Sequence, residues 1–251
     1  SPKAEPFKRW LAKVGYEIFG AESSPDQAGW VELTTDNPEI SSFFQFGTTA
    51  LTQLDGSVAF TGQAKKLYLP RVFDGPTAFR GQPASTFLSI ANPNAAPISL
   101  QITLHPIDQA LAATLAEGTL QKTRTIPGKG FFYESISEIF NTGIEIAGGF
   151  LEVEVTEGEG AIGFELIQLD NHETIIGLNA SFGNSATQSF SAQLASQEGL
   201  FTNVNLINTT LEQRTVTLTS VGSDGTNLVA RRLVLQSTCL FQGSDSLFSC
   251  H

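Results

Sequence analysis

The sequence predicts an all-β protein of two β-sandwich-like repeat units, with one short amphipathic helix near the N-terminus. Three observations predict this fold. Apolar and polar residues alternate along most of the chain, turn-forming Asp-Gly, Asn-Pro and Gly-rich stretches separate the alternating runs, and the sequence repeats itself. Alternation places apolar side chains on one face of a sheet, and such turns are typical of antiparallel hairpins.

The strands are expected where the alternation is clearest. These runs lie at 30–34, 44–46, 87–91, 98–104, 151–155, 204–207 and 216–218. The 19 Phe residues are expected at their inward-facing positions, as core residues. One N-terminal stretch has helical spacing instead, and it is carried by Phe7, Trp10, Leu11, Val14 and Ile18. We expect an amphipathic helix there, and a short helical corner at 138–140.

Composition restricts the classes of protein that the chain can belong to. The 251 residues carry a net charge of -11 and only 16% are charged, which argues against a nucleic-acid partner. An apolar share of 41% is enough for a packed core. No apolar run approaches the roughly 20 residues that a membrane-spanning helix needs, so no membrane span is expected.

The internal repeat is the most informative feature, because self-similarity at a spacing of about 120 residues determines the architecture. Residues 28–47 align without a gap on 148–167, and residues 86–93 align on 202–209. The matched positions include Trp30 with Phe150, Phe44 with Phe164, and Asn92 with Asn208.

The repeat divides the chain into three parts. Residues 1–60 hold the helix and the second half of a unit, residues 61–180 a whole unit, and residues 181–251 the first half of a unit. A half-unit leaves an apolar sheet face and an open edge, which proteins cover, pair or charge. The two halves can complete each other within one chain or between chains, or the chain can be part of a longer array, and the sequence leaves these alternatives open.

The residues of the repeat resemble those of tandem β-sandwich repeats in secreted bacterial surface proteins. The pattern is carried by Gly29, Trp30, Asp36, Pro38, Phe44, Phe46, Gly47, Asp55, Gly56, Tyr68, Pro70, Asn92 and Pro93. The second copy keeps Phe150, Phe164, Gly177, Phe190 and Asn208 but has Thr209 in place of Pro93. The resemblance implies an immunoglobulin-like or fibronectin-like sandwich without an assigned activity.

Two cysteines and the absence of Met bear on the compartment. Cys239 and Cys250 are predicted to form one disulfide, because an even number of cysteines in an acidic, Lys-poor chain favours an oxidising compartment. The chain begins at Ser1 and contains no Met, which fits a mature product. We therefore expect a secreted or cell-surface protein.

The titratable residues do not form a recognisable catalytic constellation, so no enzymatic activity, cofactor or metal is expected. The three His residues lack metal-ligand spacing, and Glu152 and Glu154 are expected on the solvated face of a strand rather than around Ca²⁺. Trp30 and Tyr68 could stack on a glycan, but core packing is the favoured interpretation because Trp30 is matched by Phe150.

These observations favour a non-enzymatic extracellular structural or adhesive repeat protein. Its incomplete ends would join head to tail into a filament or surface layer. The expected partner is then another copy of the chain or another surface protein. The N-terminal helix is expected to take part in the assembly. The alternative is a carbohydrate- or protein-binding module that uses loops at one end of the sandwich.

Overall fold

The structure is a computed structural model that describes part of the chain. The described residues are 29–34, 36, 41–47, 52–108, 119–141, 143–169, 174–183, 204–222, 224–235 and 240–243. The chain divides into two compact units, residues 1–59 and 60–251. The predicted N-terminal helix and both cysteines lie outside the described residues.

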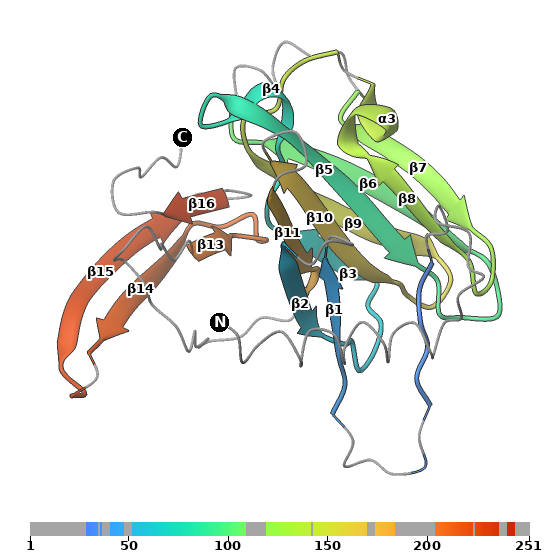
Figure 1. Ribbon diagram of the computed structural model, residues 1–251, viewed down its shortest axis with the longest axis horizontal. Helices are drawn as coiled ribbons and strands as arrows, with labels where there is room; N and C mark the ends of the chain where they lie inside the picture. The colour runs from blue at the N-terminus through green and yellow to red at the C-terminus, as the bar shows by residue number, and fades with distance from the viewer. Residues whose placement is uncertain are drawn as a thin grey trace. The chain divides into compact units, whose positions relative to one another are not determined.

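The first part of the second unit is a β-sandwich of two five-stranded sheets, which we call the complete unit (Figure 1). One sheet has the order β12 (Ser181–Phe182), β3 (Lys66–Leu69), β9 (Gly149–Glu157), β6 (Ile98–Pro106), β7 (Gln121–Ile126). The other has the order β11 (Thr174–Asn179), β10 (Ile162–Leu169), β5 (Gln82–Ala91), β4 (Asp74–Phe79), and β8 (Phe131–Ser135) also pairs with β5. Every pairing is antiparallel, so the all-β prediction is confirmed.

The core of the complete unit lies between the two sheets. Strands β6 and β9 alternate buried and half-buried residues, as a strand with one core-facing side must. The fully buried side chains include Leu67, Leu88, Ile90, Leu100, Ile102, Leu104 and Leu151. Each such side chain stabilises the fold by about 1.5–3 kcal/mol.

The expectation that Phe residues mark the inward positions is wrong for strands β5 and β10. Phe87 and Phe164 are only half-buried, whereas their neighbours Leu88 and Glu165 are fully buried. Phe87 stacks on Tyr133, with ring centroids 5.2 Å apart, on the other face of the sheet. Aliphatic residues fill the space between the sheets, and aromatic rings gain burial by stacking across strands instead.

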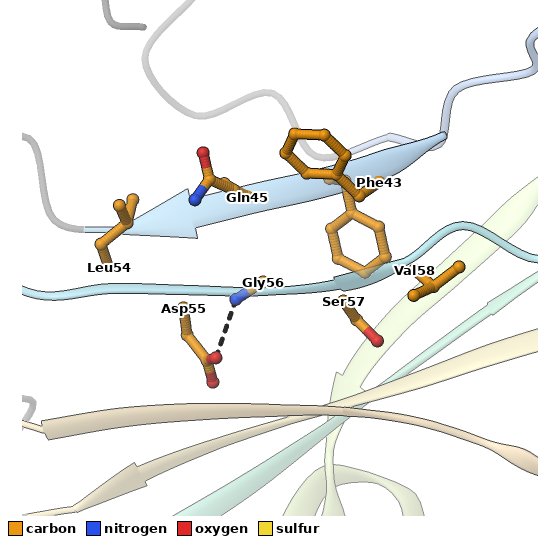
Figure 2. A pocket seen from close by; sticks show the side chains of 8 residues that line it. Phe43, Gln45, Leu54, Asp55, Gly56, Ser57 and Val58 are labelled. Atoms are coloured by element: carbon orange, nitrogen blue, oxygen red, sulfur yellow. Dashed lines mark hydrogen bonds between the residues drawn. The ribbon is translucent and has the colours of Figure 1, made fainter. Parts of the chain in front are cut away.

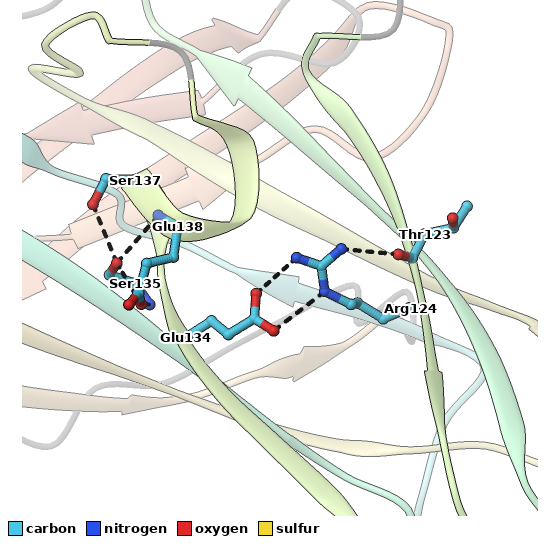
Figure 3. Close-up of polar contacts among 6 residues, drawn as sticks. All are labelled: Thr123, Arg124, Glu134, Ser135, Ser137 and Glu138. Carbon is cyan, nitrogen blue, oxygen red and sulfur yellow. Dashed lines mark hydrogen bonds and ion pairs between the residues drawn. The ribbon is translucent and has the colours of Figure 1, made fainter.

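The expected helical corner is present as α3 (Ile136–Phe140). It begins with a capping box: the backbone N–H of Glu138 donates to Ser135 Oγ, and the backbone N–H of Ser135 donates to Glu138 Oε2 (Figure 3). Beside it, Arg124 of β7 donates to both carboxylate oxygens of Glu134 of β8, at 2.7 and 3.3 Å. This ion pair links the two sheets at the end of the sandwich.

The buried amide of Asn92 fixes the corner between β5 and β6. Its Nδ2 donates to the carbonyl oxygens of Ala96, Ile126 and Pro127 at 2.8, 3.3 and 3.0 Å. Its Oδ1 accepts the backbone N–H of Asn94 at 2.9 Å. One fully buried side chain therefore hydrogen-bonds to backbone groups before β6 and at the end of β7, and ties these two segments together.

The C-terminal strands reproduce the first half of the complete unit, and we call them the C-terminal half-unit. They are β13 (Val204–Ile207), β14 (Arg214–Val221), β15 (Asn227–Leu235) and β16 (Leu240–Gly243), which form the pairs β13–β16 and β14–β15 (Figure 1). In the alignment they correspond to β5, β6, β7 and β8. Ile98 pairs with Ile126, and the matching Arg214 pairs with Leu235.

Asn208 repeats the role of Asn92 in this half-unit. Its Nδ2 donates to the carbonyl oxygens of Glu212 and Leu235, and its Oδ1 accepts the backbone N–H of Thr210 at 3.1 Å. The residues that it contacts stand where Ala96, Ile126 and Asn94 stand in the complete unit. The matched hydrogen bonds support the alignment of the two halves by geometry as well as by sequence.

The first unit holds a hairpin of β1 (Phe43–Gly47) and β2 (Leu54–Val58). The alignment matches β1 with β10, and β2 with β11. The described stretch 29–34 matches the beginning of β9, but it forms no strand in the structure, so the strand expected at 30–34 is absent there. We call residues 29–58 the N-terminal half-unit.

Replacing Asn92 with Ala should lower the free energy of unfolding by about 2–4 kcal/mol, because buried carbonyl groups lose their donor. Urea unfolding followed by circular dichroism measures this loss. The matched control is Gln63→Ala, which removes one exposed hydrogen bond to Asn94 and should change stability by less than about 0.5 kcal/mol. Equal effects of the two substitutions would contradict the role assigned to Asn92.

Candidate functional site

The candidate site is the set of sheet edges and faces that the half-units leave open. In the complete unit, β6 pairs with both β7 and β9, and β5 pairs with β10 as well as with β8. Among the described residues, β14 pairs only with β15, and β13 only with β16. The strand positions occupied by β9 and β10 in the complete unit therefore have no counterpart beside the described strands of the C-terminal half-unit.

The stretch 29–34 has the side chains of a core strand but not the burial. Leu151 and Val153 of β9 are 0% exposed. The matching residues Val31 and Leu33 are 59% and 72% exposed. Because the sequence has kept apolar residues at core positions, Val31 and Leu33 form an exposed face of the kind that is buried in the complete unit.

The β1–β2 hairpin shows the same property. Its more exposed positions are Phe43, Gln45, Gly47, Leu54, Gly56 and Val58, which alternate with half-buried residues. In the alignment, Phe43 and Gln45 match the core-facing Gly163 and Glu165 of β10. The hairpin also carries a groove of about 410 Å³, which is lined by Phe43, Phe44, Gln45, Leu54, Asp55, Gly56, Ser57 and Val58. Figure 2 shows this groove from close by, with Phe43, Leu54 and Val58 among the labelled side chains. We interpret this groove as part of an open sheet face, with the Asp55 carboxylate turned back to accept the N–H of Gly56.

The C-terminal half-unit presents a complementary face. Val216 and Leu218 of β14 are half-buried, whereas the matching Leu100 and Ile102 of β6 are fully buried. These positions alternate with exposed Thr residues, so β14 also has one core-type face. Both half-units thus carry apolar faces of the kind that pack together inside the complete unit.

Gly29 supports the same interpretation from the backbone. In the complete unit, the matching Gly149 lies so close to β6 that a Cβ atom there would stand 2.7 Å from the His105 carbonyl oxygen. A Cβ atom at Gly29 would meet nothing within 4 Å. The glycine is required where a strand approaches, and at Gly29 that strand is not among its described neighbours.

The two aromatic residues considered for glycan stacking differ in exposure. Tyr68 is 6% exposed and belongs to a small apolar cluster with Phe150. Trp30 is half-buried, although its counterpart Phe150 is 3% exposed. The burial of Tyr68 favours packing, while glycan stacking at Trp30 stays a prediction.

The glutamates of β9 lie on the outer face of their sheet and pair with a cation. Lys66 Nζ lies 2.8 Å from Glu152 Oε1 and 3.5 Å from Glu154 Oε2. The hydrogen bond to Glu152 raises the pKa of Lys66. His105 stacks on Phe150, and burial lowers the pKa of its imidazole although Glu152 lies 3.7 Å away.

A buried carboxyl group inside the sandwich was not identified from the sequence. Glu165 is 0% exposed, and neither of its carboxylate oxygens has a hydrogen-bond partner. Burial raises the pKa of Glu165 well above its usual value, although the nearby Arg71 acts in the opposite direction. The Arg71 guanidinium lies over the Phe73 ring, 5.2 Å from its centroid. The N-terminal half-unit has the neutral Gln45 at the matching position, where the side chain is exposed.

The described part of the chain holds no group of three or more His, Cys, Asp and Glu residues placed to bind a metal ion. Nor does it include a helix whose length and hydropathy would suit a membrane span.

The described residues form one β-sandwich of two five-stranded sheets and three further antiparallel strand pairs. No protein-family model matches the chain, and no curated protein does. A search of solved structures finds similarity to a protein described as Thermotoga maritima 1070. That protein is 13% identical, covers 50% of this chain with 100% of its own length, and superposes with a TM-score of 0.37. This degree of similarity carries no functional argument.

Replacing Glu165 with Gln should remove part of the pH dependence of stability. A carboxyl group whose pKa is raised on folding stabilises the protein fully below its unfolded pKa, and this contribution is lost as pH rises through the folded pKa. The E165Q variant should therefore match or exceed the wild-type melting temperature at pH 8, and scanning calorimetry from pH 4 to pH 9 measures the difference.

Two further substitutions isolate this effect. Burial raises the pKa of Asp74 from 3.8 to about 6. Asp74 therefore also makes stability fall as pH rises, but at a lower pH. For this reason E165Q is compared with its parent in an Asp74→Asn background. Glu134→Gln, which weakens the half-exposed pair with Arg124, is the control and should show no such pH dependence. If E165Q is clearly less stable than its parent at pH 8, an ionised pair with Arg71 holds the fold instead.

Proposed function

We propose that this chain is a non-enzymatic structural or adhesive repeat protein of the cell surface or extracellular space, in which half-units complete each other by strand addition. The observation that carries this proposal is the contrast in burial at matched positions. Leu151 and Val153 are 0% exposed in the complete unit, and their counterparts Val31 and Leu33 are 59% and 72% exposed. Covering these side chains would remove apolar surface from water, which favours association.

Strand addition also satisfies the backbone. An open strand edge carries unpaired N–H and C=O groups, which makes it a template for another strand. In the complete unit, β9 supplies those partners to β6 over its length, from Ser99 to Pro106. The segment 29–34 has the sequence pattern of β9 and can supply the same hydrogen bonds to β14.

The chemistry of the described residues supports a structural function. The charged groups of the complete unit pair across sheet surfaces, as Lys66 does with Glu152 and Arg124 does with Glu134. The acidic balance of the whole chain, with 25 Asp and Glu against 14 Lys and Arg, favours solubility at high surface density. The extracellular location rests on this acidic, Lys-poor composition and on the predicted disulfide.

Replacing Leu33 with Asp should abolish completion of the half-units, because a carboxylate would then be buried in the joined core. Hydrogen exchange by mass spectrometry should show that the β14 amides equivalent to those bonded to β9 are protected in the wild type. Their protection should fall by at least about tenfold in L33D. Light scattering coupled to size-exclusion chromatography reports any change of mass in the same samples.

The matched control is Thr34→Glu. Thr34 lies on the opposite face of the segment and corresponds to Glu154 of β9, so T34E reproduces the residue found in the complete unit. It should leave both protection and mass unchanged. If the β14 amides exchange freely in the wild type, or if L33D and T34E behave alike, the proposed completion is wrong.

A further inference from the structure

The hydrogen-bond registers of the complete unit fix how the open edges are filled. We propose that residues 29–34 of a second copy of this chain add to β14 as an antiparallel strand in the β6–β9 register. This inference rests on the proposed function and names the partner. In that register Thr103 pairs with Glu152, and Ile102 pairs with Val153. Transferred to the half-units, Thr219 pairs with Glu32, and Leu218 pairs with Leu33.

This register gives each side chain of the added strand a suitable surrounding. Leu33 meets Leu218 on the core face, where both positions of the complete unit are fully buried. Glu32 lies opposite Thr219 on the outer face, as Glu152 lies opposite Thr103. Gly29 then lies beside Val221, the counterpart of His105. In the complete unit, the carbonyl oxygen of His105 leaves no room for a Cβ atom at Gly149.

The second open strand is filled by the same rule. In the complete unit Phe164 of β10 pairs with Ser89 of β5. The transferred pair is Phe44 of β1 with Asn205 of β13. One donor segment can thus supply strands to both sheets of the acceptor, as β9 and β10 do within the complete unit.

Charge favours the same pairing of surfaces. The donor segment, residues 29–58, carries acidic residues but no Lys or Arg. The acceptor segment, residues 204–243, carries three arginines, Arg214, Arg231 and Arg232, against Glu212 and Asp224, which leaves a net charge of 3 − 2 = +1. Arg214 pairs with Glu212 at 2.9 Å. Opposite net charges accelerate the encounter between the two segments and disfavour pairing of donor with donor.

Donor and acceptor are different surfaces of one chain, so the contact between two copies is heterologous. Each copy that joins uses its donor on one neighbour and presents its acceptor to another. Such contacts build rings when the rotation closes and open filaments when it does not.

Cysteine pairing between separately marked chains tests the register and the partner together. Cys239 and Cys250 are first replaced with Ser, and chains carrying Glu32→Cys are then co-expressed with chains carrying Thr219→Cys. Paired residues on adjacent strands bring their Cβ atoms within about 4.5–5.5 Å, close to disulfide distance. We expect a covalent dimer, seen as a doubled mass that reverts on reduction.

The matched control pairs Glu32→Cys with Ser220→Cys, whose side chain points to the opposite face of β14. This combination should yield at least about tenfold less covalent dimer. Equal yields from the two combinations would overturn the register.

Two other outcomes separate this inference from the proposed function. If only a single chain carrying both E32C and T219C oxidises, without a doubled mass, the strand is added within one chain, and the second copy is overturned while completion stands. If no combination forms a disulfide, but the β14 amides are protected from exchange in the wild type and lose this protection in L33D, the register is overturned. Completion of the half-units again stands. Loss of that protection contrast would overturn the proposed function itself.

Discussion

The structure depends on one constraint: a β-strand is stable only when its edge is hydrogen-bonded and its apolar face is covered. In the complete unit, β9 satisfies this constraint by inserting between β3 and β6, and β10 does so by pairing with β5 on one side and β11 on the other. The half-units have kept the side chains of this arrangement, as Val31 and Leu33 show, although the described structure leaves them exposed. Local structure, packing and the proposed assembly all follow from the supply of these two strands.

Hydrogen bonds within each first half of the repeat help it to keep its shape before the added strands arrive. Asn92 and Asn208 tie the loop after their strand to the end of the following hairpin through side-chain hydrogen bonds to backbone groups. These bonds lie within one half of the repeat and do not need the added strands. The acceptor surface is therefore organised before its partner arrives, which lowers the entropy lost on association.

Much of this arrangement could be predicted from the sequence, because alternation and self-similarity are local signals. The run at 98–104 became β6, and the match of Asn92 with Asn208 proved to be a match of hydrogen bonds. Polar strands such as β7 (Gln121–Ile126) gave no alternation signal, since their pairing with β6 determines them. The burial of Glu165 was missed for a similar reason: the apolar residues beside it suggested the opposite face, and only the packed sheets decide which face is inside.

The contrast between Glu165 and Gln45 connects the core with assembly. In the complete unit, a carboxyl group at this position lies near Arg71, and its burial favours the neutral form. In the N-terminal half-unit, the matching residue on the exposed face of β1 is an amide, which has no charge to lose when it enters a core. A strand that must pass from water into a sandwich is joined more easily if its inward face is free of ionised groups. The inward positions of the donor segment, Val31, Leu33, Phe43 and Gln45, all meet this requirement, and Glu32 and Asp55, two of its four acidic residues, lie on the alternate positions.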